Sequence, residues 1–217
     1  MASRLERLAN ALLIVATLFS CIILARREFG QAPKDQTSLT FVEESRYDEL
    51  RRIGRTSGSL TASMNVMVLA DFECPACRNF DRVLRPFLAR HRNDVSYSFV
   101  HYPLGYHRFA VAAAKAAECA GGQGKFGEMH DALFDGQDSL YLVDFGMMAI
   151  QVGVKDTASF RLCVDGDGLP SRITEGVALG DAMRLRGTPT ILINGRRLSR
   201  IPTSAQLDSA LQSIKNP

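Results

Sequence analysis

The sequence predicts an α/β domain in which a strand-helix-strand unit and a strand-strand-helix unit are separated by a long helical insert. A continuous apolar run at residues 66–70 precedes apolar residues at helical spacing and an alternating strand pattern at residues 95–102. Residues 190–198 have the pattern of a β-hairpin, and a helix follows them. Between these units, residues 106–185 are rich in alanine and other helix formers.

Length and composition are those of one globular domain with additional terminal segments. The chain has 217 residues, of which 46% are hydrophobic and 23% charged, with a formal net charge of +3. This balance excludes the strong basic signature of a nucleic-acid-binding protein. Two small groups of arginines are interpreted as solvated faces rather than polyanion sites: Arg51, Arg52 and Arg55, and Arg196, Arg197 and Arg200.

The N-terminal segment predicts one transmembrane helix. Residues 8–25 contain no charge and are long enough to span a bilayer. An uncleaved anchor, a cleaved secretory signal and a lipoprotein signal ending at Cys21 are the three alternatives. The bulky Phe19 before Cys21 argues against a lipoprotein signal, and a clean small-x-small cleavage site is missing. We therefore assign residues 1–27 to a membrane anchor or signal segment, with the anchor favoured.

A polar stretch at residues 28–59 predicts a linker between this segment and the domain, which we expect to span residues 60–217. Within the linker, Tyr47, Leu50 and Ile53 fall at helical spacing before Gly54, which predicts a short amphipathic helix.

The elements of the domain follow in order. After the strand at residues 66–70, a helix is expected to continue to about His91, and a second strand covers residues 95–102. The insert at about 106–185 predicts four or five helices with short breaks. An Asn194-Gly195 turn then joins the two strands of the hairpin. Thr203 and Gln206 form a capping-box pattern for the last helix.

Two cysteines, Cys74 and Cys77, lie three residues apart between the first strand and the following helix. A zinc site needs four ligands, but Cys119 and Cys163 are isolated, so we expect no metal. A purely structural disulfide within so short a loop would stabilise little. A thiol pair that exchanges with disulfides is the interpretation that explains why the motif lies at a strand-to-helix junction.

The start of a helix favours an ionised thiol. Cys74 would lie near unpaired backbone N–H groups and the positive end of the helix dipole. A pKa lowered by about 2.5 units corresponds to roughly 3.4 kcal/mol in favour of the thiolate. Cys74 is thus predicted to be the attacking and leaving sulfur, and Cys77 the resolving thiol. Pro75 fits the first helical position, where no N–H donor is needed.

Phe72-Glu73-Cys74-Pro75-Ala76-Cys77 together with Gly187-Thr188-Pro189-Thr190 resembles the DsbA-like family of thioredoxin-fold thiol:disulfide oxidoreductases. The resemblance implies a thioredoxin fold with an inserted helical subdomain. It also implies a cis bond at Thr188-Pro189, in a loop that faces the CxxC motif and receives the extended substrate backbone. Pro189 follows Cys77 by about 112 residues, and this long separation fits a helical insert of the DsbA-like kind.

The resemblance further implies an extracytoplasmic enzyme without a cofactor, which oxidises cysteine pairs of secreted or membrane proteins through a mixed disulfide at Cys74. We expect a monomer whose recycling partner is a membrane protein of the quinone-linked or vitamin-K-reductase-like kind. The dipeptide Pro75-Ala76 lacks the histidine of the best-known family members, which leaves the direction of electron flow open. A reductase or isomerase is the first alternative, and a membrane-tethered peptide-binding or chaperone module is the second.

Cys119 and Cys163 both lie in the helical insert. A bond between them would close a loop of about 45 residues and contribute roughly 4 kcal/mol in the chain-entropy model. We hypothesise a structural disulfide, which requires an oxidising compartment; two buried free cysteines are the alternative. Glu73 is interpreted as an exposed side chain, and no chemistry is assigned to the four histidines.

Overall fold

The computed structural model of the chain describes residues 13, 17, 19–21, 39–41, 44–59 and 61–216. The chain divides into two compact units, residues 1–36 and residues 37–217. In the first unit, residues 13, 17 and 19–21 are helical. The expected transmembrane segment at residues 8–25 falls mostly outside the described residues. Among those described, no helix is both long and apolar enough to cross a membrane.

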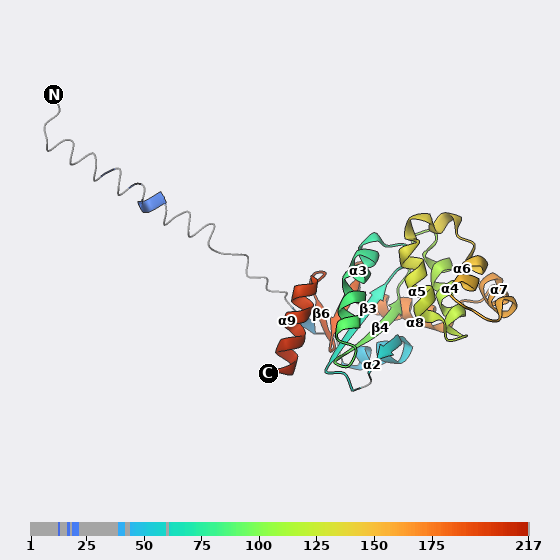
Figure 1. The fold of residues 1–217 in the computed structure, drawn as a ribbon, viewed down its shortest axis with the longest axis horizontal. Coiled ribbons are helices and arrows are strands. Elements are labelled where there is room, and N and C mark those ends of the chain that lie inside the picture. The colour runs from blue at the N-terminus through green and yellow to red at the C-terminus, as the bar shows by residue number, and fades with distance from the viewer. Residues whose placement is uncertain are drawn as a thin grey trace, which may run out of the picture. The chain divides into compact units, whose positions relative to one another are not determined.

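The second unit is built on a six-stranded mixed sheet with the order β1-β6-β5-β3-β4-β2. β3 and β4 pair in parallel and the other neighbours are antiparallel. The strands are β1 (Leu39–Phe41), β2 (Arg55–Gly58), β3 (Met64–Ala70), β4 (Val95–His101), β5 (Thr190–Ile193) and β6 (Arg196–Leu198). This arrangement confirms the predicted βαβ unit and the C-terminal hairpin (Figure 1).

Helices cover the sheet and form the insert. They are α2 (Glu44–Ile53), α3 (Pro75–Arg90), α4 (Ala110–Gly121), α5 (Phe126–Asp135), the 3-10 helix η1 (Gln137–Leu142), α6 (Phe145–Gln151), α7 (Thr157–Asp165), α8 (Ser171–Ala182) and α9 (Ser204–Lys215). The helical insert is confirmed, with five α-helices and one 3-10 helix between residues 106 and 185. Figure 1 shows α4, α5, α6 and α7 gathered beside the sheet.

The central strand β3 is buried on both faces, which is why its sequence is continuously apolar rather than alternating. Val66 and Val68 belong to the larger core, which includes residues of α3, α4 and α9. Met67 and Leu69 point to the opposite face and pack with Leu50 of α2 and other residues of α2 and α8. Because successive strand residues face opposite sides, one strand supports both layers of helices.

Two glycines allow α8 to lie unusually close to β4. A Cβ atom at Gly176 would overlap the carbonyl oxygen of His101, and one at Gly180 would lie 2.5 Å from a ring carbon of Tyr102. Neither glycine has a positive φ, so their role is close packing rather than backbone conformation. This contact fixes the last helix of the insert to the sheet.

The stretch predicted as a polar linker is more structured than its sequence suggests. α2 covers the residues at which a short amphipathic helix was expected, and its Leu50 is fully buried. The flanking residues form the two edge strands, β1 and β2. Strands of three and four residues that join the sheet only along its edges need no alternating apolar pattern, so sequence periodicity does not reveal them.

Candidate active site

Cys74 occupies the N-cap of α3, directly after the strand β3 and a short turn. Its backbone is extended, with φ −75° and ψ 117°, and Pro75 takes the first helical position as predicted. The Cys74 carbonyl accepts hydrogen bonds from the N–H groups of Cys77 and Arg78. The motif therefore forms the first turn of the helix, where the dipole favours a negative sulfur.

The loop before β5 faces Cys74. The Thr188–Pro189 peptide bond is cis, and the Cys74 thiol donates a hydrogen bond to the Thr188 carbonyl oxygen at 3.3 Å. The Thr188 hydroxyl is buried and has no other hydrogen-bond partner among the described residues. The Thr188 side chain is one of the causes that lower the pKa of Cys74. Residues more than one hundred positions apart thus meet at one sulfur.

The surroundings of Cys74 lower its pKa from 9.0 to about 5. A hydrogen bond from the Cys77 thiol is the largest cause. Burial opposes it, and the Thr188 side chain and the backbone N–H groups of Ala76 and Cys77 add smaller contributions. Cys74 is consequently a thiolate at neutral pH, which is the reactive form in disulfide exchange.

Cys77 has the opposite character. Its side chain is only 2% exposed, whereas Cys74 retains 7%. Burial strongly raises the pKa of Cys77, and the neighbouring Cys74 raises it further. Both thiols are free. The pair therefore combines one ionised sulfur with one neutral sulfur that is more completely buried.

Two carboxylates before the motif tie it to the loop that leads into α4. Asp71 is buried and accepts hydrogen bonds from the backbone N–H groups of Glu73 and Leu104, at 2.7 and 2.8 Å. Its other contact is with His107 Nδ1, at 2.7 Å. Glu73 is half-buried and accepts a hydrogen bond from the backbone N–H of Phe109. It holds the entry to α4 and is not the exposed side chain that the sequence suggested.

Gln137 of η1 reaches the motif from the insert. Its side-chain amide donates to the carbonyl oxygens of Phe72, at 2.6 Å, and Cys74, at 3.0 Å. This residue cannot be predicted from the sequence, because a single glutamine in a helical region carries no distinguishing pattern. The contact connects the helical insert to the reactive turn.

A buried ionic group lies on the insert side of the sheet. Glu118 of α4 contacts His101 Nε2 at 2.9 Å and accepts from Arg55 Nε at 3.0 Å. Burial raises the pKa of Glu118, but the hydrogen bonds from His101 and Arg55 outweigh it and lower the pKa to about 2. Burial also lowers the pKa of His101 despite its acidic neighbour. Glu118 thereby links β2, β4 and α4 through charge.

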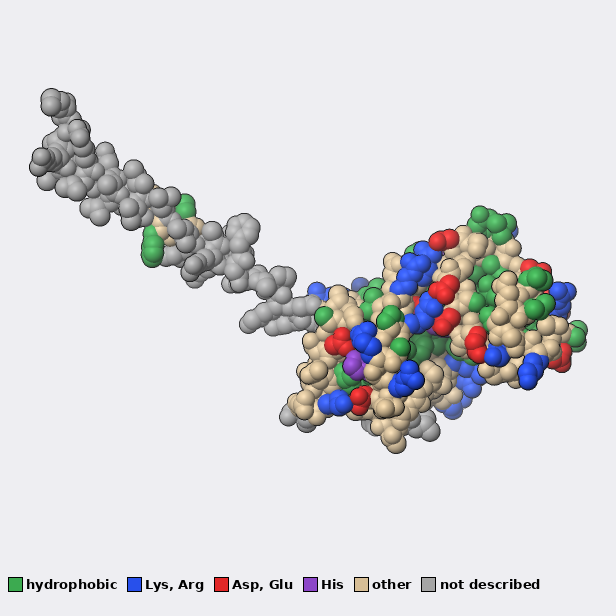
Figure 2. Space-filling model, viewed as in Figure 1, with side chains coloured by type: hydrophobic (Ala, Val, Ile, Leu, Met, Phe, Trp, Pro, Cys, Tyr) green, Lys and Arg blue, Asp and Glu red, His purple; other side chains and the backbone are tan. Residues whose placement is uncertain are grey.

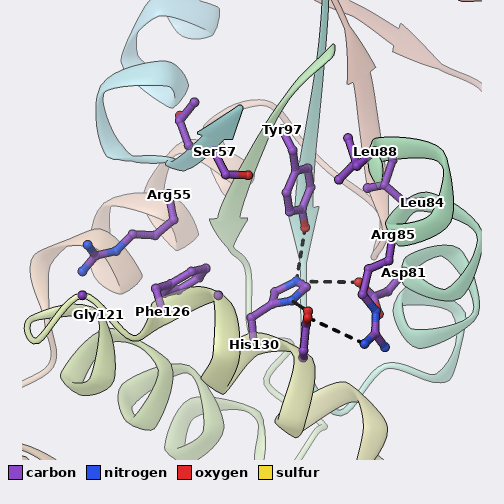
Figure 3. A pocket seen from close by; sticks show the side chains of 14 residues that line it. Arg55, Ser57, Asp81, Leu84, Arg85, Leu88, Tyr97, Gly121, Phe126 and His130 are labelled. Carbon is purple, nitrogen blue, oxygen red and sulfur yellow. Dashed lines mark hydrogen bonds and ion pairs between the residues drawn. The ribbon is translucent and has the colours of Figure 1, made fainter. Parts of the chain in front are cut away.

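A cavity of about 500 Å³ lies between the β2 edge, α3 and α5 (Figure 3). His130 projects into it and contacts the Tyr97 hydroxyl at 3.3 Å and Asp81 Oδ1 at 3.9 Å. Asp81, His130 and Asp131 hold potential metal-ligand atoms within 4.8 Å of one another. Arg85 Nε, however, lies 2.6 Å from Asp81 Oδ2, so a cationic group already neutralises this carboxylate.

The same arginine makes the surface between α3 and α5 a mixture of charges. Arg85 also pairs with Asp131 and Asp135 of α5, and the hydrogen bond to Asp135 is the largest cause that raises the pKa of Arg85. Basic and acidic side chains lie next to one another on this face (Figure 2). Such a surface suits helix-helix attachment rather than the binding of a polyanion.

Cys119 of α4 and Cys163 of α7 are joined by a disulfide, with their Cα atoms 5.8 Å apart. The bond connects two helices of the insert, and Cys119 is buried in the core. It does not take part in the CxxC site. Of the site residues predicted from sequence, Cys74, Cys77, Thr188 and Pro189 come together, and this second pair lies apart from them.

A reactive cysteine at a helix start, a mixed sheet and an opposing cis-proline loop define the thioredoxin class of proteins. A family model described as Thioredoxin matches residues 52–213. The chain therefore belongs to the thioredoxin family, within which its helical insert gives it the DsbA-like form of the fold.

Curated relatives share this domain as part of longer proteins. The chain is 38% identical over 141 residues to the Na(+)/H(+) antiporter NhaA 3 of Salinispora tropica, covering 64% of this chain and 21% of that protein. It is 34% identical over 159 residues to the Na(+)/H(+) antiporter NhaA 1 of Mycolicibacterium vanbaalenii, covering 72% and 26%. The chain thus spans about a fifth to a quarter of the length of these relatives.

Solved structures with the same fold include BdbD from Bacillus subtilis, with a TM-score of 0.66 and 20% identity over 76% of this chain and 95% of that one. Alpha-DsbA1 from Wolbachia pipientis has a TM-score of 0.63 and 18% identity over 75% and 91%. A periplasmic thioredoxin-like protein from Salmonella enterica has a TM-score of 0.64 and 17% identity over 81% and 99%. These likenesses establish the fold.

Proposed function

We propose that this chain is an extracytoplasmic thiol:disulfide oxidoreductase that oxidises cysteine pairs of secreted or membrane proteins through a mixed disulfide at Cys74. The observation that carries the proposal is the position of Cys74, with a pKa of about 5, at the N-terminus of α3 and opposite the cis Thr188–Pro189 bond. The DsbA-like fold of the structural neighbours supports the same chemistry.

The reaction starts from the disulfide form of the CxxC pair. A client thiolate attacks Cys74 Sγ, the Cys74–Cys77 bond breaks, and Cys77 takes up a proton as the leaving group. A second client thiolate then attacks the client sulfur of the mixed disulfide and expels Cys74 as a thiolate. Two electrons have moved from the client to the CxxC pair, and the client leaves with a disulfide.

The direction in which electrons move between the client and the CxxC pair depends on how stable the reduced pair is relative to its disulfide. A thiolate that is favoured in the reduced protein is a good leaving group and makes the disulfide a stronger oxidant. The lowered pKa of Cys74 therefore supports oxidation of clients over their reduction. The reductase or isomerase alternative uses the same residues in the opposite direction.

An oxidising compartment is supported by the Cys119–Cys163 disulfide, because such bonds persist mainly outside the cytoplasm. The uncharged segment at residues 8–25 supports a membrane tether. We propose that a membrane redox protein of the quinone-linked or vitamin-K-reductase-like kind accepts the two electrons and restores the Cys74–Cys77 disulfide.

The redox potential tests the direction. The full chain in detergent is equilibrated in glutathione buffers, and the fraction of oxidised CxxC is measured by thiol trapping and mass spectrometry. A potential near the value of about −120 mV known for strong oxidants supports an oxidase. A potential near about −270 mV, as in thioredoxin, contradicts the oxidase and leaves the reductase.

A peptide-binding or chaperone module is the second alternative, and Cys74→Ser separates it from the enzyme. The oxidoreductase loses all exchange activity with this substitution, since no other sulfur in the motif is near the surface. A binding module retains its function. The matched control is Cys21→Ser, which removes a free thiol outside the site.

A further inference from the structure

A groove of about 700 Å³ begins at the cis-proline loop. It is lined by residues 183–191, which include Thr188 and Pro189, and by residues 197–201. Cys74 Sγ lies 3.3 Å from the carbonyl oxygen of Thr188, which also lines the groove, so a polypeptide that reaches Cys74 along this loop has the groove beside it. The side chains of the groove are therefore the first surface that flanking client residues meet.

Four arginines line the groove: Arg184, Arg186, Arg197 and Arg200. Among the described residues that line it, none is an aspartate or a glutamate. We call it the arginine groove. The sequence alone predicts a solvated face for Arg197 and Arg200, but the fold places them beside the cis-proline loop. Leu198 and the exposed Ile201 add apolar surface between the cations.

Three of these cations have no partner of their own. Among the residues that the structure describes, the side chains of Arg184, Arg186 and Arg197 make no hydrogen bond or ion pair. Some arginines elsewhere in the domain are paired, as Arg55 is with Glu118 and Arg85 with Asp81. The like charges of Arg184, Arg186 and Arg197 produce a positive potential that attracts anions.

We propose that the arginine groove selects client polypeptides that carry aspartate or glutamate residues close to the reactive cysteine. The inference rests on the proposed function and adds the chemical class of its substrates. In an extended client, residues two positions apart face the same side, so acidic residues at such spacing reach the groove together. Several weak exposed ion pairs then act in concert on the rate of encounter.

The test compares two dithiol peptides of equal length that differ only at the flanking positions, with aspartates in one and lysines in the other. The oxidised full chain in detergent reacts with each peptide, samples are quenched with acid, and mass spectrometry gives the second-order rate constants. We expect the acidic peptide to react about tenfold faster at low ionic strength. The preference should shrink at about 1 M salt, where screening extends to about 3 Å.

Substitutions in the arginine groove test whether its side chains cause the faster reaction with the acidic peptide. The double substitution Arg186→Gln and Arg197→Gln should reduce the ratio of the two rate constants to within about twofold, and Arg→Lys at the same positions should restore it. Arg92→Gln is the matched control, since Arg92 is exposed and follows the opposite end of the 16-residue helix α3, about 24 Å from Cys74. It should leave the ratio unchanged.

The outcomes separate this inference from the proposed function. Equal rates for the two peptides, or a preference that survives the double substitution, overturn the inference while exchange chemistry stands. Failure of both peptides to become oxidised overturns the proposed function and the inference with it. A preference for the basic peptide also contradicts the inference.

Discussion

At the scale of single residues, the two sulfurs of the motif differ because of what surrounds each of them. Cys74 has hydrogen-bond donors and a helix N-terminus, whereas Cys77 has a hydrophobic environment that disfavours its charge. The same side-chain chemistry therefore gives a thiolate at one position and a neutral thiol three residues later.

Cys77→Ala tests this account. The variant removes the hydrogen bond that contributes most to the thiolate, so we expect the pKa of Cys74 to rise above about 5. The measurement is the pH dependence of Cys74 alkylation in a Cys21→Ser background, in which Cys74 is the one remaining free thiol. In the parent, the rate falls as pH drops through about 5; an identical midpoint in the variant would contradict the assigned cause.

Residues that support the motif were harder to predict than the motif itself. Cys74, Cys77, Thr188 and Pro189 could be predicted because the spacing and chemistry of each pair are distinctive. Asp71 and Gln137 could not be predicted, because the role of a buried polar side chain becomes visible only when its hydrogen-bond partners in the fold are known. Those partners lie 36 residues away for His107 and 65 for Phe72.

At the scale of secondary-structure elements, charge and close packing attach the insert to the sheet. Glu118 joins α4 to β2 and β4, and the glycines of α8 bring that helix against β4. The strands and helices themselves were predicted well, since their apolar periodicity is local. The edge strands β1 and β2 were not, because their place in the sheet depends on backbone pairing with distant residues.

Glu118→Gln should destabilise the domain by about 3 kcal/mol near neutral pH, because Arg55 and His101 lose a buried partner. The folded pKa of Glu118 is lowered to about 2, so its stabilisation is present above the unfolded value of about 4.5 and lost as pH falls towards 2. Urea unfolding at several pH values measures both effects.

The matched control for that experiment is Glu128→Gln, which removes a surface pair with Lys125. Its effect should stay within about 0.5 kcal/mol. Equal effects of the two substitutions would show that the buried pair contributes no more than an exposed one. An unchanged acid dependence in Glu118→Gln would contradict the assigned pKa.

Gly176→Ala should cost about 2–4 kcal/mol, because its methyl group meets the His101 carbonyl and α8 must move away from β4. Gly127→Ala in α5 is the control. No atom lies within 4 Å of the added methyl group there, so the higher helix propensity of alanine should stabilise the domain by up to about 1 kcal/mol. Thermal unfolding of both variants gives the comparison, and equal shifts would refute close packing at Gly176.

At the scale of the whole molecule, the helical insert is stabilised by a covalent bond as well as by packing. The Cys119–Cys163 disulfide joins α4 to α7 across a sequence separation of 44 residues. The structural disulfide hypothesised from the sequence is thus present, and its loop is long enough for the bond to constrain the unfolded chain appreciably.

Removing this bond with Cys119→Ala and Cys163→Ala together should lower the free energy of unfolding by about 4 kcal/mol. Urea unfolding is compared with that of Cys74→Ser/Cys77→Ser, which removes the other cysteine pair. Adding reductant should destabilise the second variant, and it should leave the first unchanged when that variant starts with its Cys74–Cys77 pair reduced. If reductant affects neither, the two cysteines are packed as free thiols.

In the reaction proposed above, the burial of Cys77 would also set the lifetime of the covalent complex with a client. Once a client is attached to Cys74, a return attack by Cys77 would cancel the reaction, and that attack needs a thiolate that the buried site disfavours. The client's second thiol therefore has time to reach the mixed disulfide first. The depth of one sulfur thus governs how often an encounter ends in product rather than in release of the unchanged client.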